Sequence, residues 1–190
     1  MPAITEQPGY SPSVYSEQER SELLRIAHLS IDAKLADGKL MFPPVSEHLS
    51  EPRAAFTTLH LDGRLRGCVG FVEPVLPLYQ TVAETAEAAA FHDNRFYPVP
   101  ADEAPRLKIE ISVLSPLAAI RPDEVVVGKH GLVVSYRGRR GLLLPQVPVE
   151  QLWDREKFIA ETCRKASLPL DAVAQGATLQ AFTAEVFGEE

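Results

Sequence analysis

The residue types best suited to chemistry lie in one short segment, Leu65-Arg66-Gly67-Cys68-Val69-Gly70. Side chains alternate along a strand, so Arg66 and Cys68 are expected on the same face. A guanidinium beside a thiol favours the nucleophilic thiolate and can also bind a carboxylate or phosphate through two parallel hydrogen bonds. Gly67 and Gly70 weaken a strand, which predicts the close approach of a bulge, another backbone or a ligand. The segment therefore predicts a ligand-binding site for nucleophilic or thiolate-anchored chemistry, with an inert, buried Cys68 as the alternative.

Other chemistries have weaker support. His130 precedes Gly131 and is a candidate proton carrier, with a solvated loop residue as the alternative. The five histidines are scattered and neither cysteine has a ligand at zinc-site spacing, so no metal site is expected. Phosphate-loop, dinucleotide-binding and Gly-x-Ser-x-Gly patterns do not occur in the sequence. A basic turn at 137–140 offers an anion contact, although the sequence favours a solvated hairpin tip as its explanation.

The composition is that of a soluble globular protein. Of the 190 residues 45% are hydrophobic and 24% are charged, and the net charge is -7. An acidic chain has no general attraction to nucleic acid or to anionic membranes, so neither is expected as a partner. Cys68 and Cys163 lie far apart, which is typical of a reducing compartment. With no signal-peptide pattern and no apolar run of about 20 residues, we expect a cytoplasmic protein.

Local signals predict an α+β domain over residues 16–190 that follows a flexible tail at 1–15. Ser16 and Glu19 form a capping box for a helix that ends near Gly38. Two strands, at 54–61 and 64–71, flank an Asp-Gly pair that favours a two-residue hairpin turn. If this turn sets the register, Cys68 lies opposite Thr57 and Arg66 opposite Leu59, and His60 points to the other face.

The remaining elements are also expected from periodicity and turn residues. A helix with a small-residue face is expected at 78–92, and helical structure at 149–166 is expected to break near Asp154. The expected strands are 107–113, 125–127, a hairpin of 131–136 with 141–144, and a final strand at 178–187. Paired strands without regular βαβ alternation predict a mixed, largely antiparallel sheet with flanking helices.

Several separated motifs, in order, make residues 16–187 resemble the AMMECR-one family. They are Leu-Arg-Gly-Cys-Val-Gly at 65–70, Ala-Ala-Phe-His-Asp-Asn-Arg-Phe at 89–96 with Pro-Val at 98–99, the segment 107–116, His-Gly-Leu at 130–132, Leu-Pro-Gln-Val at 144–147, Trp-Asp at 153–154 and Cys-Arg-Lys-Ala at 163–166. The resemblance implies an α+β fold with two sublobes. It also makes Asp93 and Arg95 candidates to line a cleft with Arg66 and Cys68, with Asp93 as the weaker catalytic candidate and Arg95 as a ligand-binding one. The alternative is a local turn in which Asp93 is a cap paired to Arg95.

The resemblance further implies partners but no agreed activity. Prokaryotic family members look like protein A of the AmmeMemoRadiSam system, whose other parts are a Memo-like protein and a radical SAM protein. An unidentified small molecule, an unidentified cofactor and either an enzyme or an adaptor role are compatible with this resemblance. A role in nucleic-acid transactions has also been suggested for the family, and the acidic composition does little to support it.

Overall fold

The structure is a computed structural model that describes residues 14–190. The first helix, α1 (Glu17–Leu35), begins with the expected capping box, in which the Ser16 hydroxyl accepts from the Glu19 amide and the Glu19 carboxylate accepts from the Ser16 amide. Most of the predicted tail, residues 1–13, lies outside the described residues. Tyr15, at the end of that tail, is buried in the core, so order begins before Ser16.

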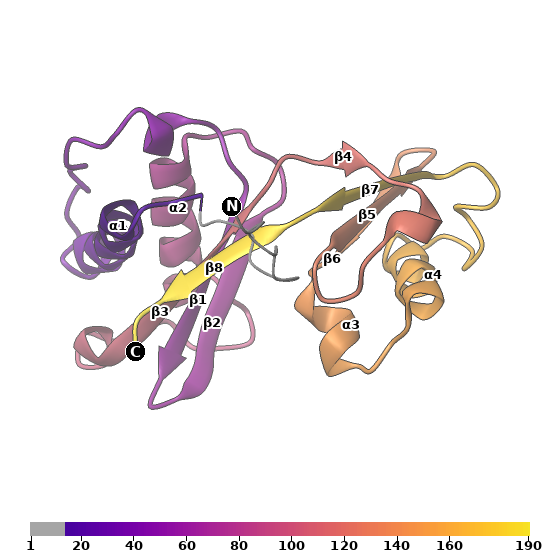
Figure 1. Cartoon of the computed structure of the whole chain (residues 1–190). Coiled ribbons are helices and arrows are strands. Elements are labelled where there is room, and N and C mark those ends of the chain that lie inside the picture. The colour runs from indigo at the N-terminus through magenta and orange to yellow at the C-terminus, as the bar shows by residue number, and fades with distance from the viewer. Residues whose placement is uncertain (1–13) are drawn as a thin grey trace, which may run out of the picture.

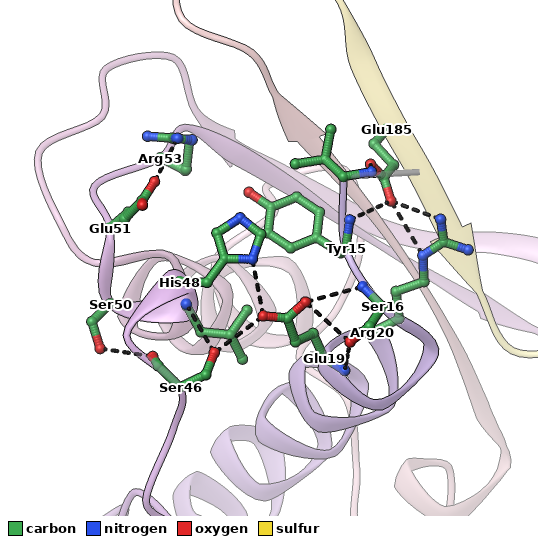
Figure 2. Close-up of polar contacts among 12 residues, drawn as sticks. Tyr15, Ser16, Glu19, Arg20, Ser46, His48, Ser50, Glu51, Arg53 and Glu185 are labelled. Carbon is green, nitrogen blue, oxygen red and sulfur yellow. Dashed lines mark hydrogen bonds and ion pairs between the residues drawn. The ribbon is translucent and has the colours of Figure 1, made fainter. Parts of the chain in front are cut away.

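A polar network fastens the beginning of α1 to distant segments (Figure 2). The Glu19 carboxylate also accepts a hydrogen bond from Ser46 and lies 2.9 Å from Nδ1 of His48, whose ring stacks on Tyr15. The Glu185 carboxylate binds the Tyr15 amide and forms an ion pair with Arg20 at 2.7 Å. Segments at 14–20, 46–48 and 185 are thus held together at one end of the helix.

The first lobe is an antiparallel four-stranded sheet with the order β2-β1-β3-β8. Its strands are β1 (Ala55–Leu61), β2 (Arg64–Phe71), β3 (Leu107–Leu114) and β8 (Ala184–Gly188). Helices α1 and α2 (Leu78–Phe91) cover one face of this sheet (Figure 1). The core between them is built from alternate strand residues such as Leu59 and Ile111 and from the helix residues Leu23 and Val82.

The second lobe is another antiparallel four-stranded sheet, with the order β4-β7-β5-β6. Its strands are β4 (Ala118–Ala119), β5 (Gly131–Tyr136), β6 (Arg139–Leu143) and β7 (Thr178–Phe182). Helix α4 (Arg155–Lys165) packs on this sheet through Phe158 and Cys163, and the short helix α3 (Gln146–Glu150) precedes it. Three single-turn 3₁₀ helices complete the described elements: η1 (His48–Ser50), η2 (Ala104–Arg106) and η3 (Pro122–Glu124).

Two chain crossings join the lobes. Residue Ser115 follows β3 and residue Thr183 separates β7 from β8, and their backbones are hydrogen-bonded at 2.8 Å. A third apolar cluster lies at this junction and contains Phe56 from the first lobe with Val133 and Phe182 from the second. The lobes therefore share a core at the point where the chain passes between them.

The predicted α+β class and antiparallel pairing are confirmed, and two strand predictions are wrong. Residues 125–127 form a loop rather than a strand, in which Val125 is buried against the second-lobe core. The expected strand at 178–187 is two strands, because the chain leaves one sheet at Thr183 and enters the other. The predicted break at Asp154 is confirmed: its side chain caps α4 by accepting from the Lys157 amide at 2.8 Å. Within residues 14–190, no helix has the length and apolar character needed to cross a membrane.

Candidate functional site

The β1–β2 hairpin has the predicted Asp62-Gly63 turn, but its register is not the one that the turn alone predicts. Both turn residues have positive φ, as a type I′ turn requires. The pairing then shifts between Leu59 and His60, so Arg66 is an extra residue with no partner on β1, and Cys68 lies opposite Thr58 instead of Thr57. A β-bulge at this point interrupts the alternation on which the shared face of Arg66 and Cys68 depended.

The shift also corrects the placement of His60. Strand β1 pairs regularly with β3 over its whole length, so its side chains alternate without interruption. Thr58 and His60 are two residues apart and share a face, and Cys68 lies directly opposite Thr58. His60 is therefore on the face of Cys68, although sequence reasoning placed it on the other.

Arg66 turns toward the loop that connects α2 with β3. Its Nε donates to Glu103 at 2.8 Å, and its Nη1 donates to the Tyr97 carbonyl at 2.9 Å. Its side chain is only 13% exposed, and the Glu103 carboxylate offsets its charge. The arginine of the motif thus fastens the loop at 97–103 to the sheet.

Cys68 is a free, half-buried cysteine on an edge strand, and a carboxylate and a guanidinium bind its backbone. Its amide donates to Oδ2 of Asp93 at 2.9 Å, and its carbonyl accepts from Nη2 of Arg95 at 3.4 Å. These two side chains take the place of a neighbouring strand at that residue. The sulfur itself accepts a hydrogen bond from the Thr58 hydroxyl at 3.3 Å.

Asp93 and Arg95 form a tight ion pair at 2.7 Å. Hydrogen bonds from the Arg95 side chain, followed by those from the amides of Cys68 and Arg95, hold the pKa of Asp93 well below its usual range against the opposing effect of burial. Hydrogen bonding to Asp93 in turn raises the pKa of Arg95, and the charge of a Cys68 thiolate contributes in the same direction. Arg95 is therefore held close to Cys68 mainly through its ion pair with Asp93. The predicted local turn with Asp93 as its cap is also present, since the Arg95 amide donates to Asp93.

The two glycines of the motif are explained by packing. A Cβ on Gly67 would stand 2.1 Å from the carbonyl oxygen of Ala89 in α2, and one on Gly70 would stand 2.2 Å from the ring of Phe56. The close approach that the sequence predicts is made by a helix backbone and an aromatic ring. On those sides of Gly67 and Gly70, protein atoms occupy the space that was expected to admit a ligand.

A surface cavity of about 400 Å³ adjoins this strand. It is lined by Arg66, Arg95, Phe96, Tyr97, Pro98, Pro100 and Glu103. The guanidinium of Arg95 lies 5.4 Å from the Phe96 ring centre, and its side chain is 58% exposed. Arg95 therefore contacts both the backbone of Cys68 and this cavity, whereas Cys68 does not line the cavity itself.

The remaining candidates lie apart from this region. His130 is in the second lobe, where its Nδ1 accepts from the Val126 amide at 3.1 Å, and burial lowers its pKa. Arg137 lies in the β5–β6 turn, and Arg139, the first residue of β6, donates to the Ser167 carbonyl. Cys163 is fully buried on the core-facing side of α4, and this burial raises the pKa of its thiol. Across the described part of the chain, no three His, Cys, Asp or Glu side chains gather as a metal site would require.

Sequence reasoning missed three contributors to the site: Thr58, Tyr97 and Glu103. The pairing of Thr58 with Cys68 could not be predicted, because no sequence signal in the hairpin identifies Arg66 as the bulged residue. Glu103 is separated from Arg66 by 37 residues. A carboxylate at that separation has no sequence pattern that connects it to the motif.

Comparison with known proteins agrees with the resemblance found in the sequence. The AMMECR1 family model matches residues 24–187. Protein MJ0810 of Methanocaldococcus jannaschii is 38% identical over 182 residues, which cover 90% of each chain. Protein PH0010 of Pyrococcus horikoshii is 41% identical over 182 residues, which cover 88% of each chain. The crystal structure of PH0010, an uncharacterised protein, matches with a TM-score of 0.81 at 39% identity, over 92% of this chain and 93% of that one. The chain belongs to the AMMECR1 family.

Proposed function

We propose that this protein acts through Cys68, Asp93 and Arg95 on an anionic small molecule or on an intermediate delivered by a partner protein. The observation that supports this most is that Asp93 and Arg95 bind both backbone polar groups of Cys68. This arrangement holds an exposed guanidinium against the backbone of a free cysteine, and the same guanidinium lines the adjoining cavity. A carboxylate or phosphate on Arg95 would therefore be anchored next to the strand that carries the thiol.

Each side chain has a distinct role in this proposal. Arg95 binds the anionic group of the ligand, and Asp93 fixes the position of Arg95. Cys68 is the thiolate nucleophile or the anchor for the intermediate. Arg66, whose charge Glu103 offsets, forms a wall of the cavity and holds its loop in place.

We propose in addition that the partners are a Memo-like protein and a radical SAM protein, as the sequence resemblance implies. In the three-part AmmeMemoRadiSam system, a Memo-like protein and a radical SAM protein would supply or consume the ligand of this site. Binding of each purified partner to this protein, measured by calorimetry, tests that part separately from the chemistry of the thiol.

The central proposal predicts that Arg95 attracts anionic reagents to Cys68. The ratio of the alkylation rates with iodoacetate and iodoacetamide reports this attraction, because the two reagents differ mainly in charge. A unit charge pair near 4 Å in water is worth about 1 kcal/mol, so Arg95→Ala is expected to lower the ratio about threefold to fivefold. Labelling should be absent in Cys68→Ser, since Cys163 is fully buried.

Two arginine variants serve as controls for this experiment. Arg137→Ala removes an exposed cation from the second lobe, and it is expected to leave the ratio unchanged. Arg66→Ala is expected to lower the ratio less than Arg95→Ala does, because the Arg66 side chain is only 13% exposed, whereas that of Arg95 is 58% exposed and contacts the Cys68 backbone. A ratio that depends on Arg66 and not on Arg95 would contradict the proposed assignment of roles.

A non-catalytic binding module is the second candidate, and two exposed apolar side chains favour it. Tyr97 is 89% exposed and Leu65 is 43% exposed, and they lie on the loop and strand that Arg66 joins. Exposed aromatic residues frequently contribute much of the energy of protein interfaces. Loss of partner binding in Tyr97→Ala, with an unchanged ratio of alkylation rates, would favour this second function.

A further inference from the structure

We propose that Thr58 is a positioning residue that promotes ionisation of Cys68, an inference that rests on Cys68 being the working group of the proposed site. The two residues are directly opposite each other on β1 and β2. The Thr58 hydroxyl donates to the Cys68 sulfur at 3.3 Å. Both side chains are half-buried, so the protein partly shields this pair from solvent.

The backbone of the hairpin explains why this hydrogen bond is held in place. The amide and carbonyl of Cys68 point outward to Asp93 and Arg95, so Cys68 and Thr58 form the pair type without hydrogen bonds between their own backbones. In antiparallel sheets this pair type brings opposite side chains closest together. The β-branch of Thr58 also restricts rotation about χ1, which limits the positions available to its hydroxyl.

A hydrogen bond donated to a thiolate favours that charged form over the neutral thiol. The sequence assigned this effect to Arg66, but in the structure Arg66 binds Glu103 and the Tyr97 carbonyl. Thr58 is the side chain that binds the sulfur directly. Its hydroxyl therefore replaces the motif arginine as the neighbour that promotes thiolate formation.

Other titratable groups face the pair from every adjacent element. His60 shares its face on β1, and Glu110 of β3 lies opposite Thr58 on the other side. Asp93 and Arg95 approach from the loop that follows α2. A test must therefore separate the effect of the hydroxyl from the effects of these charges.

The test is the rate of Cys68 alkylation by neutral iodoacetamide as a function of pH. Thr58→Val preserves the shape of the side chain and removes the donor. Net contributions of single hydrogen bonds are about 0.5 to 1.5 kcal/mol, so the rate at neutral pH is expected to fall about threefold to tenfold. The plateau at high pH is expected to remain, because the thiol is then fully ionised in both proteins. Thr58→Ser keeps a donor, and its rate at neutral pH is expected to approach that of the wild type.

Two matched variants make the result decisive. Thr57→Val removes the neighbouring hydroxyl, which is on the opposite face and bonds to Thr85 at 2.8 Å, and it is expected to leave the pH profile unchanged. His60→Gln is expected to leave it unchanged as well. The proposal fails if Thr58→Val has the wild-type profile, or if His60→Gln produces the shift instead. The ratio of iodoacetate to iodoacetamide rates is expected to survive Thr58→Val, so failure here is distinguishable from failure of the proposed anion site.

Discussion

The carboxylate of Asp93 joins the edge strand β2 to the loop that carries Arg95. It accepts hydrogen bonds from the Cys68 amide, from the Arg95 amide and from the Arg95 side chain. All of these favour the ionised form, which is why the pKa of Asp93 lies below its usual range. Neutralising this one side chain should therefore loosen the loop, the edge of β2 and Arg95 together.

Asp93→Asn is expected to lower the free energy of unfolding at neutral pH by about 1 to 2 kcal/mol, because charge-assisted hydrogen bonds are replaced by weaker ones. A depressed folded-state pKa contributes stability above about pH 4, the range in which the unfolded carboxyl is also ionised. That contribution is lost as the pH falls below 4 toward the folded-state pKa. The urea unfolding midpoints of wild type and variant are thus expected to differ by a constant amount from pH 7 to about pH 4, and to approach each other as the pH falls further toward the folded-state pKa.

The exposed Asp102, on the same loop, provides the control for this prediction. Asp102→Asn is expected to leave the midpoint nearly unchanged at every pH, since exposed single charges contribute little. A difference between Asp93→Asn and wild type that already shrinks above pH 4, or that does not shrink at all below it, would contradict the assigned cause.

At the scale of residues, the sequence named several residues of the candidate site but only some of their contacts. Cys68, Asp93 and Arg95 were candidates, and the structure brings them into contact. The partner of Arg66 was not predictable, because Glu103 arrives through a loop whose path depends on the packed core. The pairing of Thr58 with Cys68 was not predicted, because the turn determines the register of the hairpin only up to the β-bulge at Arg66.

At the scale of elements, helix α2 packs unusually closely on the motif strand. The Ala89 carbonyl occupies the space where a Gly67 side chain would stand. The small residues of α2, including Ala86 and Ala90, are buried on the same side. This contact sets the distance between β2 and α2, the helix that precedes Asp93 and Arg95.

Gly67→Ala is expected to destabilise the protein by about 2 to 3 kcal/mol, because backbone atoms must shift to admit the methyl group. Gly38→Ala is the matched control: its Cβ would meet its nearest neighbour at 3.6 Å, which is ordinary contact. Thermal or urea unfolding measures both. Equal stability of Gly67→Ala and wild type would show that α2 can withdraw from the strand without penalty.

Elements with local signals were predicted well, and those determined by the tertiary structure were not. The capping box at Ser16, the turn at Asp62 and the cap at Asp154 each act within four residues, and all three are confirmed. The three valines at 125–127 predicted a strand. In the structure Val125 is buried in the second-lobe core from a loop, so its apolar character reflects burial rather than strand pairing. The transition at Thr183 has no glycine or proline beside it, so only the arrangement of the two sheets reveals it.

At the scale of the whole molecule, the shared cluster at the junction couples the lobes. Phe182 is almost fully buried there, and its ring lies against Gly131, where a Cβ would stand 2.2 Å from it. The Phe56 ring lies against Gly70 in the other lobe in the same way. An ion pair between Arg140 and Glu73 adds a second contact between the lobes, although both partners are largely exposed.

Phe182→Ala is expected to lower the free energy of unfolding by about 3 to 5 kcal/mol, the usual loss for a buried phenylalanine. It should also uncouple the lobes. The single tryptophan, Trp153, packs in the second lobe, so its fluorescence reports that lobe while far-UV circular dichroism reports both. The two denaturation curves are expected to separate in the variant and to coincide in the wild type. Phe42→Ala, at a partly exposed position, is expected to shift both curves slightly and together.

The two crossings at Ser115 and Thr183 have a consequence for the order in which the protein forms. Residues 118–182 are one continuous stretch that supplies every strand of the second sheet, inserted between β3 and β8 of the first. During synthesis the residues of the inserted lobe are translated before β8, so the host sheet lacks the strand that closes one edge throughout that time. The edge of β3 is therefore open to the wrong partner for as long as it takes to translate some seventy residues, at the usual 5 to 20 residues per second. The motif strand is on the opposite edge, so β1 can pair with it before that delay begins.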